Sequence, residues 1–189
     1  MRKNPIANAI GLIIFIGFNL TSAPSFSAES MKPGSSIPEF NLKAPDSKAM
    51  KAYLGLKDEK SFSPSQIKAK LIVIEFFDVF CPVCQKNAPM VNRLFKTIQE
   101  DKDLSNDVKL LGIALEGQPD ELSAYRQKFK CEFPLFTDPE KEIQSKLKIS
   151  YVPIIVVVNK QGKVLLNHIG LFENIDTVLV EIRKNVQSR

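Results

Sequence analysis

A buried strand that leads directly into two closely spaced cysteines constrains the fold of this chain more than any other feature. Residues Leu71-Ile72-Val73-Ile74-Glu75-Phe76-Phe77 are apolar at every position except Glu75, with β-branched or aromatic side chains on both alternating faces. This composition predicts a central strand that is covered on both sides. A Cys81-Pro82-Val83-Cys84 motif follows, and apolar residues then recur at helical spacing from Val91 to Ile98. We therefore expect a strand and a helix with the cysteines at their junction.

Further patterns predict an α/β domain with a mixed sheet and helices on both of its faces. Buried strands are expected at Val108–Leu115 and Ile154–Val158, and Lys163–Ile169 is expected to return as a hairpin partner. Short edge strands are expected near Glu39–Leu42 and Lys60–Phe62, in the polar N-terminal part of the chain.

Three more helices are predicted from apolar side chains three and four residues apart. The first is expected to begin at Pro119 and to bury Leu122, Tyr125 and Phe129. The second is expected to have Asp138 as its N-cap and Pro139 as its first residue, and to bury Ile143 and Leu147. The third is a C-terminal helix whose apolar face consists of Ile175, Val178, Leu179, Ile182 and Val186.

The first 28 residues have the features of a secretory signal peptide. Arg2 and Lys3 precede an apolar run at residues 9–18, which is shorter than the ~20 residues that a membrane-spanning helix needs. Ser25 and Ser27 supply the small side chains of a cleavage site. We expect residues 1–28 to be a signal peptide, with an uncleaved anchor as the alternative.

The charge balance gives little support for nucleic-acid binding. The chain has 26 basic and 21 acidic side chains, and removal of Arg2 and Lys3 with the leader lowers the 26 to 24. No run of Lys or Arg is longer than two residues, and no basic stripe is interleaved with aromatic residues. We therefore expect no nucleic-acid partner.

Cys81 and Cys84 are predicted to form a redox pair, because disulfides form and persist in exported proteins. Pro82 suits the first position of the following helix, which would place Cys81 at the helix N-terminus. Free N–H groups and the helix dipole there favour a thiolate. We predict that Cys81 is the nucleophile that attacks a partner disulfide and that the more buried Cys84 resolves the mixed disulfide. A structural disulfide and half of a zinc site are the alternatives.

Glu75 and Pro153 are further candidates for this site. A carboxylate in the middle of an apolar strand should have a raised pKa, and Glu75 could then relay the proton of Cys84. The alternative is a Glu at the end of the strand that reaches solvent. Pro153 cannot donate a hydrogen bond into a sheet, so it marks a strand start or a bend. With a cis peptide bond it would form a tight turn that could lie against the cysteine pair.

The segment from Val73 to Cys84 resembles the active-site strand and C-x-x-C motif of thioredoxin. Glu75 matches the buried acid of that family, Pro89 its helix-kinking proline, and Val152-Pro153 the cis-proline that shapes its partner-binding groove. The resemblance implies that the substrate groove is lined by Phe80, Pro82, Val83 and Val152.

The subgroup that the chain most resembles is the exported TlpA/ResA-like thioredoxins. The Gly34-Ser35-Ser36-Ile37-Pro38-Glu39-Phe40-Asn41-Leu42 opening and the Asp120–Lys130 insertion carry this similarity, which covers residues 34–186. It implies that residues 34–189 form a thioredoxin-like domain, with a central mixed β-sheet flanked by helices and an N-terminal β-hairpin extension.

The resemblance also implies a function. The protein would be a thiol-disulfide oxidoreductase in the periplasm or on the outer face of the bacterial cytoplasmic membrane. It would most often reduce disulfides of cell-envelope client proteins, such as apocytochromes awaiting haem, with electrons from a membrane-embedded donor. It would act as a monomer and need no cofactor or metal beyond the Cys81–Cys84 disulfide. Val is the residue expected before the cis-proline of DsbA-like oxidants, and this chain has Val152 at that position. The alternative is therefore that the protein catalyses the reverse reaction and forms disulfides in its clients.

Two other functions on the same fold remain open. A thiol peroxidase of the peroxiredoxin type needs a Thr three residues before its reactive cysteine, where this chain has Asp78. A Sco-type copper metallochaperone uses a cysteine pair and a distant His, for which His168 is the only candidate. His168 is otherwise expected to be a surface or half-buried strand residue. Cys131 is interpreted as a small buried hydrophobe, with a third redox partner or an intermolecular link as the alternatives.

Overall fold

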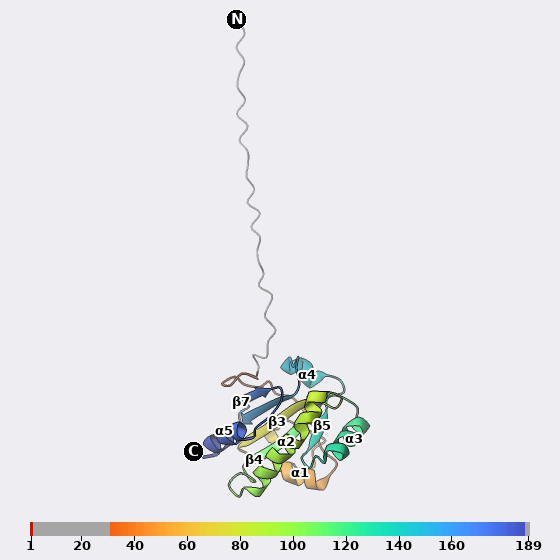
Figure 1. Cartoon of the computed structure of the whole chain (residues 1–189), viewed down its shortest axis with the longest axis vertical. Coiled ribbons are helices and arrows are strands. Elements are labelled where there is room, and N and C mark those ends of the chain that lie inside the picture. The colour runs from red at the N-terminus through yellow and green to blue at the C-terminus, as the bar shows by residue number, and fades with distance from the viewer. Residues whose placement is uncertain (2–30, 188–189) are drawn as a thin grey trace.

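The computed structural model describes Met1 and residues 31–187 of the chain (Figure 1). Apart from Met1, the predicted signal peptide lies outside the described residues. Within the described part, no helix has both the length and the apolar character needed to cross a bilayer.

A five-stranded mixed sheet forms the centre of the domain. Its strands are β3 (Leu71–Asp78), β4 (Val108–Glu116), β5 (Leu135–Thr137), β6 (Ile154–Asn159) and β7 (Val164–Ile169), which lie in the order β5-β4-β3-β6-β7. The strands β3, β4 and β5 are parallel, whereas β6 is antiparallel to both β3 and β7. The predicted mixed sheet with helices on both faces is therefore confirmed, with β3 at its centre.

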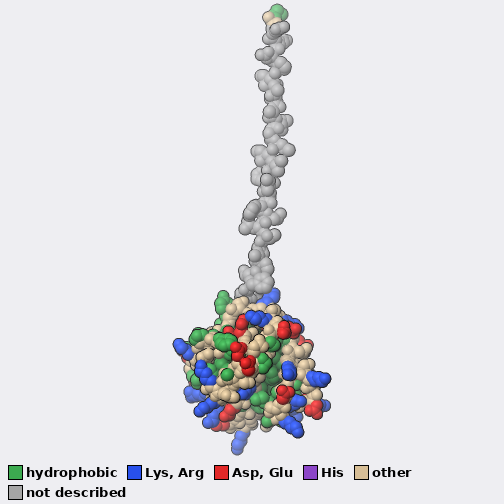
Figure 2. Space-filling view, turned by 90° about the vertical axis from the view of Figure 1, so that its right-hand side faces the viewer, with side chains coloured by type: hydrophobic (Ala, Val, Ile, Leu, Met, Phe, Trp, Pro, Cys, Tyr) green, Lys and Arg blue, Asp and Glu red, His purple; other side chains and the backbone are tan. Residues whose placement is uncertain are grey.

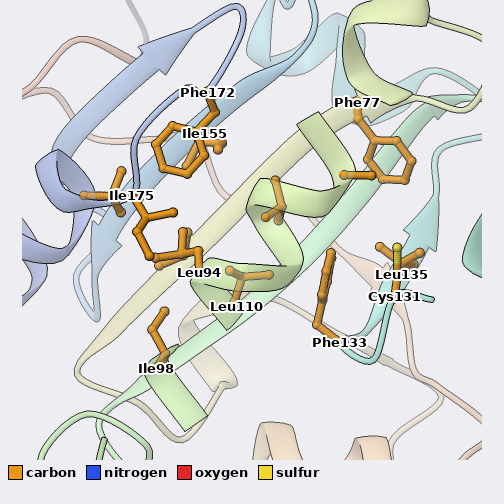
Figure 3. Packing of buried hydrophobic residues seen from close by; sticks show 14 of the residues in the cluster. Phe77, Leu94, Ile98, Leu110, Cys131, Phe133, Leu135, Ile155, Phe172 and Ile175 are labelled. Atoms are coloured by element: carbon orange, nitrogen blue, oxygen red, sulfur yellow. The ribbon is translucent and has the colours of Figure 1, made fainter. Parts of the chain in front are cut away.

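Helices cover both faces of this sheet. The helices α2 (Pro82–Glu100), α3 (Pro119–Phe129) and α5 (Asp176–Gln187) pack on one face (Figure 1). On that face Leu94 and Ile98 of α2 lie over Leu110 of β4, and Ile155 and Phe172 belong to the same cluster (Figure 3). The short helices α1 (Lys48–Leu54) and α4 (Glu142–Leu147) contribute to a second cluster on the other face.

The alternation of side chains along β3 divides the two clusters. Val73 and Phe77 belong to the cluster beneath α2, whereas Ile72, Ile74 and Phe76 belong to the opposite cluster. Glu75 lies between Val73 and Phe77 in this alternation, so it is on the α2 face of the sheet.

The surface charges are mixed in sign. Figure 2 shows Lys and Arg side chains interspersed with Asp and Glu over one face of the molecule. Ion pairs join Lys70 to Asp107 at 2.9 Å and Arg183 to Asp101 at 2.7 Å. Surface pairs of this kind contribute only about 0–1 kcal/mol each, so the stability of the domain comes mainly from its two apolar clusters.

The N-terminal extension contains a two-stranded antiparallel sheet, β1 (Leu42–Lys43) and β2 (Ser61–Phe62). Its first strand begins at the end of the range predicted from the sequence. The sequence patterns did not indicate the helix α1 between the strands, or the 3-10 turn η2 (Pro64–Gln66) after them. The Ser47 hydroxyl caps α1 by accepting from the Met50 N–H.

The helix predicted from Asp138-Pro139 begins later than expected. Residues 139–140 form a turn, and α4 begins at Glu142 after Lys141, whose φ of 55° breaks the helix there. The Asp138 carboxylate nevertheless accepts hydrogen bonds from the backbone N–H groups of Ile143 at 3.1 Å and Gln144 at 2.8 Å. The prediction of the helix start was wrong because this buried carboxylate reaches across a turn to its N–H partners.

We expect Asp138→Ala to destabilise the domain by about 1–2 kcal/mol, because two N–H groups of α4 lose their acceptor. Urea unfolding followed by circular dichroism measures this loss. The matched variant Asp138→Asn keeps one carbonyl oxygen and should lose less. An Asp138→Ala protein as stable as wild type would contradict this capping role.

Candidate active site

The two cysteines lie at the start of α2. Cys81 is the N-cap residue and Pro82 occupies the first helical position, as the sequence predicted. The Cys81 sulfur accepts a hydrogen bond from the backbone N–H of Cys84 at 3.3 Å. Cys81 is half-buried and Cys84 is fully buried, and both are free thiols. Burial raises the pKa of the Cys84 thiol, and the neighbouring Cys81 raises it further.

The connection between β3 and α2 is fixed by local hydrogen bonds. The Asp78 carboxylate accepts from the Phe80 N–H at 2.7 Å, and the Asp78 carbonyl accepts from the Cys81 N–H at 3.2 Å. The Gln85 side chain donates to the Val79 carbonyl at 2.9 Å. These contacts hold the reactive sulfur at one place relative to the central strand.

The loop before β6 forms a second wall next to Cys81. The peptide bond between Val152 and Pro153 is cis, and the Val152 carbonyl oxygen lies 4.0 Å from the Cys81 sulfur. Val152 is half-buried and Pro153 is buried. The structure therefore brings together two segments that are 71 residues apart in the sequence.

Exposed apolar side chains surround this pair of walls. Phe80 is 61% exposed and Val83 is 40% exposed on the cysteine side, and Tyr151 is 73% exposed beside Val152. A pocket of about 120 Å³ lies against the same loop, lined by Asp78, Leu115, Glu116, Gln144, Ile149, Ser150, Tyr151 and Val152. A nucleophile ringed by exposed apolar groups suits a partner protein better than a small polar molecule.

Glu75 lies on the α2 face of β3, inside the domain. Its residue is only 2% exposed, which excludes the alternative of a strand-end side chain that reaches solvent. Burial raises its pKa from 4.5 to about 8, and its Oε1 atom has no hydrogen-bond partner in the described part of the chain. The negative charge of Glu75 also raises the pKa of the Cys84 thiol. The buried acid therefore opposes ionisation of the buried thiol.

Cys131 lies beside Phe133 and Leu135 in the cluster beneath α2 (Figure 3). Burial is the main cause that raises the pKa of its thiol to about 12. The Arg126 guanidinium donates to the backbone carbonyls of Cys131 at 2.8 Å and Phe133 at 2.9 Å. These contacts agree with the interpretation of Cys131 as a small buried apolar residue.

His168 is half-buried on β7, and its Nε2 atom lies 2.9 Å from the Leu171 carbonyl oxygen. No group of three or more His, Cys, Asp or Glu side chains in the described residues is arranged to hold a metal ion.

One feature near the site was not predicted from the sequence. Asn87 is fully buried on α2, one turn after Cys84. A polar residue on the same helix face as Cys84, Val91 and Leu94 is a signal that could have identified it.

Comparisons with known proteins agree on the class of fold. Residues 33–166 match the family described as the AhpC/TSA family. The chain is 21% identical over 154 residues to the thiol-disulfide oxidoreductase ResA of Bacillus subtilis (strain 168), covering 82% of this chain and 76% of that protein. It is 23% identical over 176 residues to a protein of the same name from Bacillus cereus, covering 90% of this chain and 91% of that protein.

Solved structures of similar fold include a putative thiol:disulfide interchange protein DsbE from Chlorobium tepidum. That structure has a TM-score of 0.64 and 16% identity, and the match covers 83% of this chain and 99% of that one. StoA from Bacillus subtilis has a TM-score of 0.58 and 18% identity, over 79% and 98% of the two chains. At these identities the solved structures establish the fold.

Proposed function

This chain belongs to the AhpC/TSA family of thioredoxin-like proteins, and we propose that it is an exported reductase that uses Cys81 and Cys84 to reduce disulfides in cell-envelope client proteins. One observation carries this proposal. The half-buried Cys81 thiol lies at the N-terminus of α2, accepts a hydrogen bond from the Cys84 N–H, and lies 4.0 Å from the Val152 carbonyl oxygen. The similarity to proteins named thiol-disulfide oxidoreductases supports it.

The reaction follows from the different burial of the two thiols. The Cys81 thiolate attacks one sulfur of the client disulfide, whose S–S bond breaks as a mixed disulfide forms. The released client thiolate takes up a proton. The Cys84 thiolate then attacks the Cys81 sulfur, which frees the second client thiolate and leaves a Cys81–Cys84 disulfide. Two electrons have passed from the cysteine pair to the client.

Glu75 is proposed as the proton relay of the second step. Cys84 must lose its proton to attack, yet burial opposes its ionisation. A neighbouring carboxyl group with a pKa of about 8 loses its own proton close to neutral pH, and its carboxylate form can then accept the Cys84 proton and return it later. Because the Cys84 thiol is fully buried, the relay must come from inside the domain.

The groove of the proposed client lies between the two walls beside Cys81. Phe80 in the turn before α2 forms one wall together with Pro82 and Val83 at the start of that helix, and Val152 and Pro153 form the other. The exposed apolar side chains of Phe80 and Val83 support this assignment. Clients whose disulfide is flanked by apolar residues would fit it, and apocytochromes awaiting haem are the proposed class of client.

The proposed cycle sets requirements outside the domain. Each turnover leaves a Cys81–Cys84 disulfide, so a membrane-embedded donor must return two electrons and two protons. The monomer needs no cofactor or metal, because the cysteine pair itself carries the electrons. The place of action is the periplasm or the outer face of the bacterial cytoplasmic membrane, which the apolar leader supports.

The reduction potential of the Cys81–Cys84 pair tests the direction of this reaction. We expect a value near the ~−270 mV of thioredoxin rather than the ~−120 mV of DsbA. Equilibration with a glutathione buffer measures it on residues 29–189 carrying Cys131→Ser. A potential near that of DsbA would overturn the reductase assignment and make the protein an oxidant, with Val152 and Pro82-Val83 the first residues to exchange.

A further inference from the structure

Asn87 is a buried polar side chain whose hydrogen bonds are all made outside its own helix. It lies on α2, one turn after Cys84, and is completely buried. Its Nδ2 atom donates to the Gly170 carbonyl at 3.2 Å, and its Oδ1 atom accepts from the Phe172 N–H at 2.6 Å. A buried amide is tolerated only where both of its ends are paired, so Asn87 fixes α2 to the turn after β7.

The same turn is bonded to the loop that faces the reactive sulfur. The Gly170 N–H donates to the Pro153 carbonyl at 2.9 Å. Gly170 therefore receives the Asn87 amide at its carbonyl and holds Pro153 with its N–H. One residue before Pro153, the Val152 carbonyl lies beside the Cys81 sulfur.

These contacts close a ring around the proposed groove. On one side, β3 continues through the turn at residues 78–80 into α2, which carries Cys81. On the other side, β3 pairs with β6, which begins directly after Pro153. The hydrogen bonds from Asn87 to Gly170 and from Gly170 to Pro153 connect α2 to the residue that precedes β6. The ring therefore ties the segment that carries Cys81 to the loop that carries Val152.

We propose that Asn87 is a positioning residue that sets the distance between Cys81 and the Val152-Pro153 loop, so that a client polypeptide is held with its disulfide in line with the Cys81 sulfur. This inference rests on the proposed reductase function. Reactions of this kind depend on alignment, and a misplacement of ~1 Å can cost ~100-fold in rate. A small disulfide that approaches Cys81 from solvent needs no groove, so its reaction does not depend on Asn87.

The test compares a protein disulfide with a small one. The two substrates are insulin and the aromatic disulfide DTNB, and the variants are Asn87→Leu and Asn87→Asp. We expect both variants to lose about 10- to 100-fold in kcat/KM for insulin while the rate constant with DTNB changes by less than about twofold. Asn87→Asp preserves volume and the acceptor for the Phe172 N–H, and its ionised form cannot donate to Gly170, so at a pH where this carboxyl group is ionised it tests the bond that leads to Pro153.

Asn92→Leu is the matched control. Asn92 lies on the same helix and donates its amide to the Phe129 carbonyl at 2.7 Å, which ties α2 to α3 away from the groove. We expect this variant to keep the wild-type ratio of insulin to DTNB rates. Thermal unfolding of all three variants records any general loss of stability.

Two results would overturn the inference. One is an equal loss of both rates in Asn87→Asp, which would mean that Asn87 serves only the stability of the fold. The other is an unchanged insulin rate in both Asn87 variants. If the wild-type protein reacts with DTNB but does not reduce insulin, the proposed reductase function fails instead, and the groove assigned to Asn87 fails with it.

Discussion

Cys81→Ser is expected to abolish protein disulfide reduction, with a loss of at least about 1,000-fold, the scale on which removal of a nucleophile acts. Only Cys81 combines partial exposure with a hydrogen bond from the α2 N-terminus, whereas Cys84 is completely buried. Insulin reduction followed by turbidity measures the loss.

Cys84→Ser should behave differently, because Cys81 can still attack but the mixed disulfide cannot be resolved. A covalent adduct with the client should accumulate and be visible on a non-reducing gel. The variant is best made together with Cys131→Ser, which leaves Cys81 as the only thiol of the chain. Cys131→Ser alone is the control and should retain activity.

The same variants separate a reductase from a thiol peroxidase. Rapid peroxide consumption that survives Cys84→Ser but not Cys81→Ser would contradict the proposed function. The residue three positions before Cys81 is Asp78, whose carboxylate accepts the Phe80 N–H. It offers no hydroxyl to orient a peroxide.

Glu75→Gln is expected to remove about 4 kcal/mol of the pH dependence of folding between pH 5 and pH 8.5. The pKa of Glu75 is about 8 in the folded chain and 4.5 without burial, so the folded state binds more protons between these values. The stabilising effect of its proton is therefore complete below pH 4.5 and is lost as the pH rises through 8. Wild-type stability should fall more steeply with pH than that of Glu75→Gln.

Urea unfolding of the reduced protein at several pH values measures this difference. Glu116→Gln is the control, because it removes a carboxylate that is exposed at the end of β4 instead of one that is buried. Parallel stability profiles for wild type and Glu75→Gln would contradict a raised pKa for Glu75.

The relay role of Glu75 has a separate kinetic readout. Release of the client from the mixed disulfide should accelerate in the wild-type protein as the pH rises through 8, because the Glu75 carboxylate is then free to accept the Cys84 proton. Glu75→Gln should be slower and should lose this pH dependence. Equal release rates for the two proteins would show that Cys84 loses its proton by another route.

Long elements with a repeating pattern were predictable from the sequence. The β3 strand is a nearly continuous apolar run and the α2 helix repeats apolar residues at helical spacing, and Cys81 follows from its place between them. The burial of Glu75 was inferred from the apolar residues on both sides of it. The three-residue strand β5 was not, because it is too short to show a period.

Tertiary partners explain the other differences. The Asp138 carboxylate caps a helix that begins four residues later, and no local rule for N-caps predicts that distance. Asn87 has its partners more than 80 residues away, at Gly170 and Phe172. The hydrogen-bond partners of Asn87 could therefore not be predicted from local sequence patterns, whereas Cys81 and Cys84 could.

Under the proposed export, the separation between Cys81 and its opposite wall has a consequence for the order in which the parts of the chain emerge from the membrane. Both thiols are present once residue 84 has crossed the membrane, but Val152 follows 71 residues after Cys81, and the Phe172 partner of Asn87 comes later still. An incompletely translocated chain therefore carries the cysteine pair without the proposed groove that would bind a client polypeptide. Discrimination between clients begins only when almost the whole polypeptide has arrived.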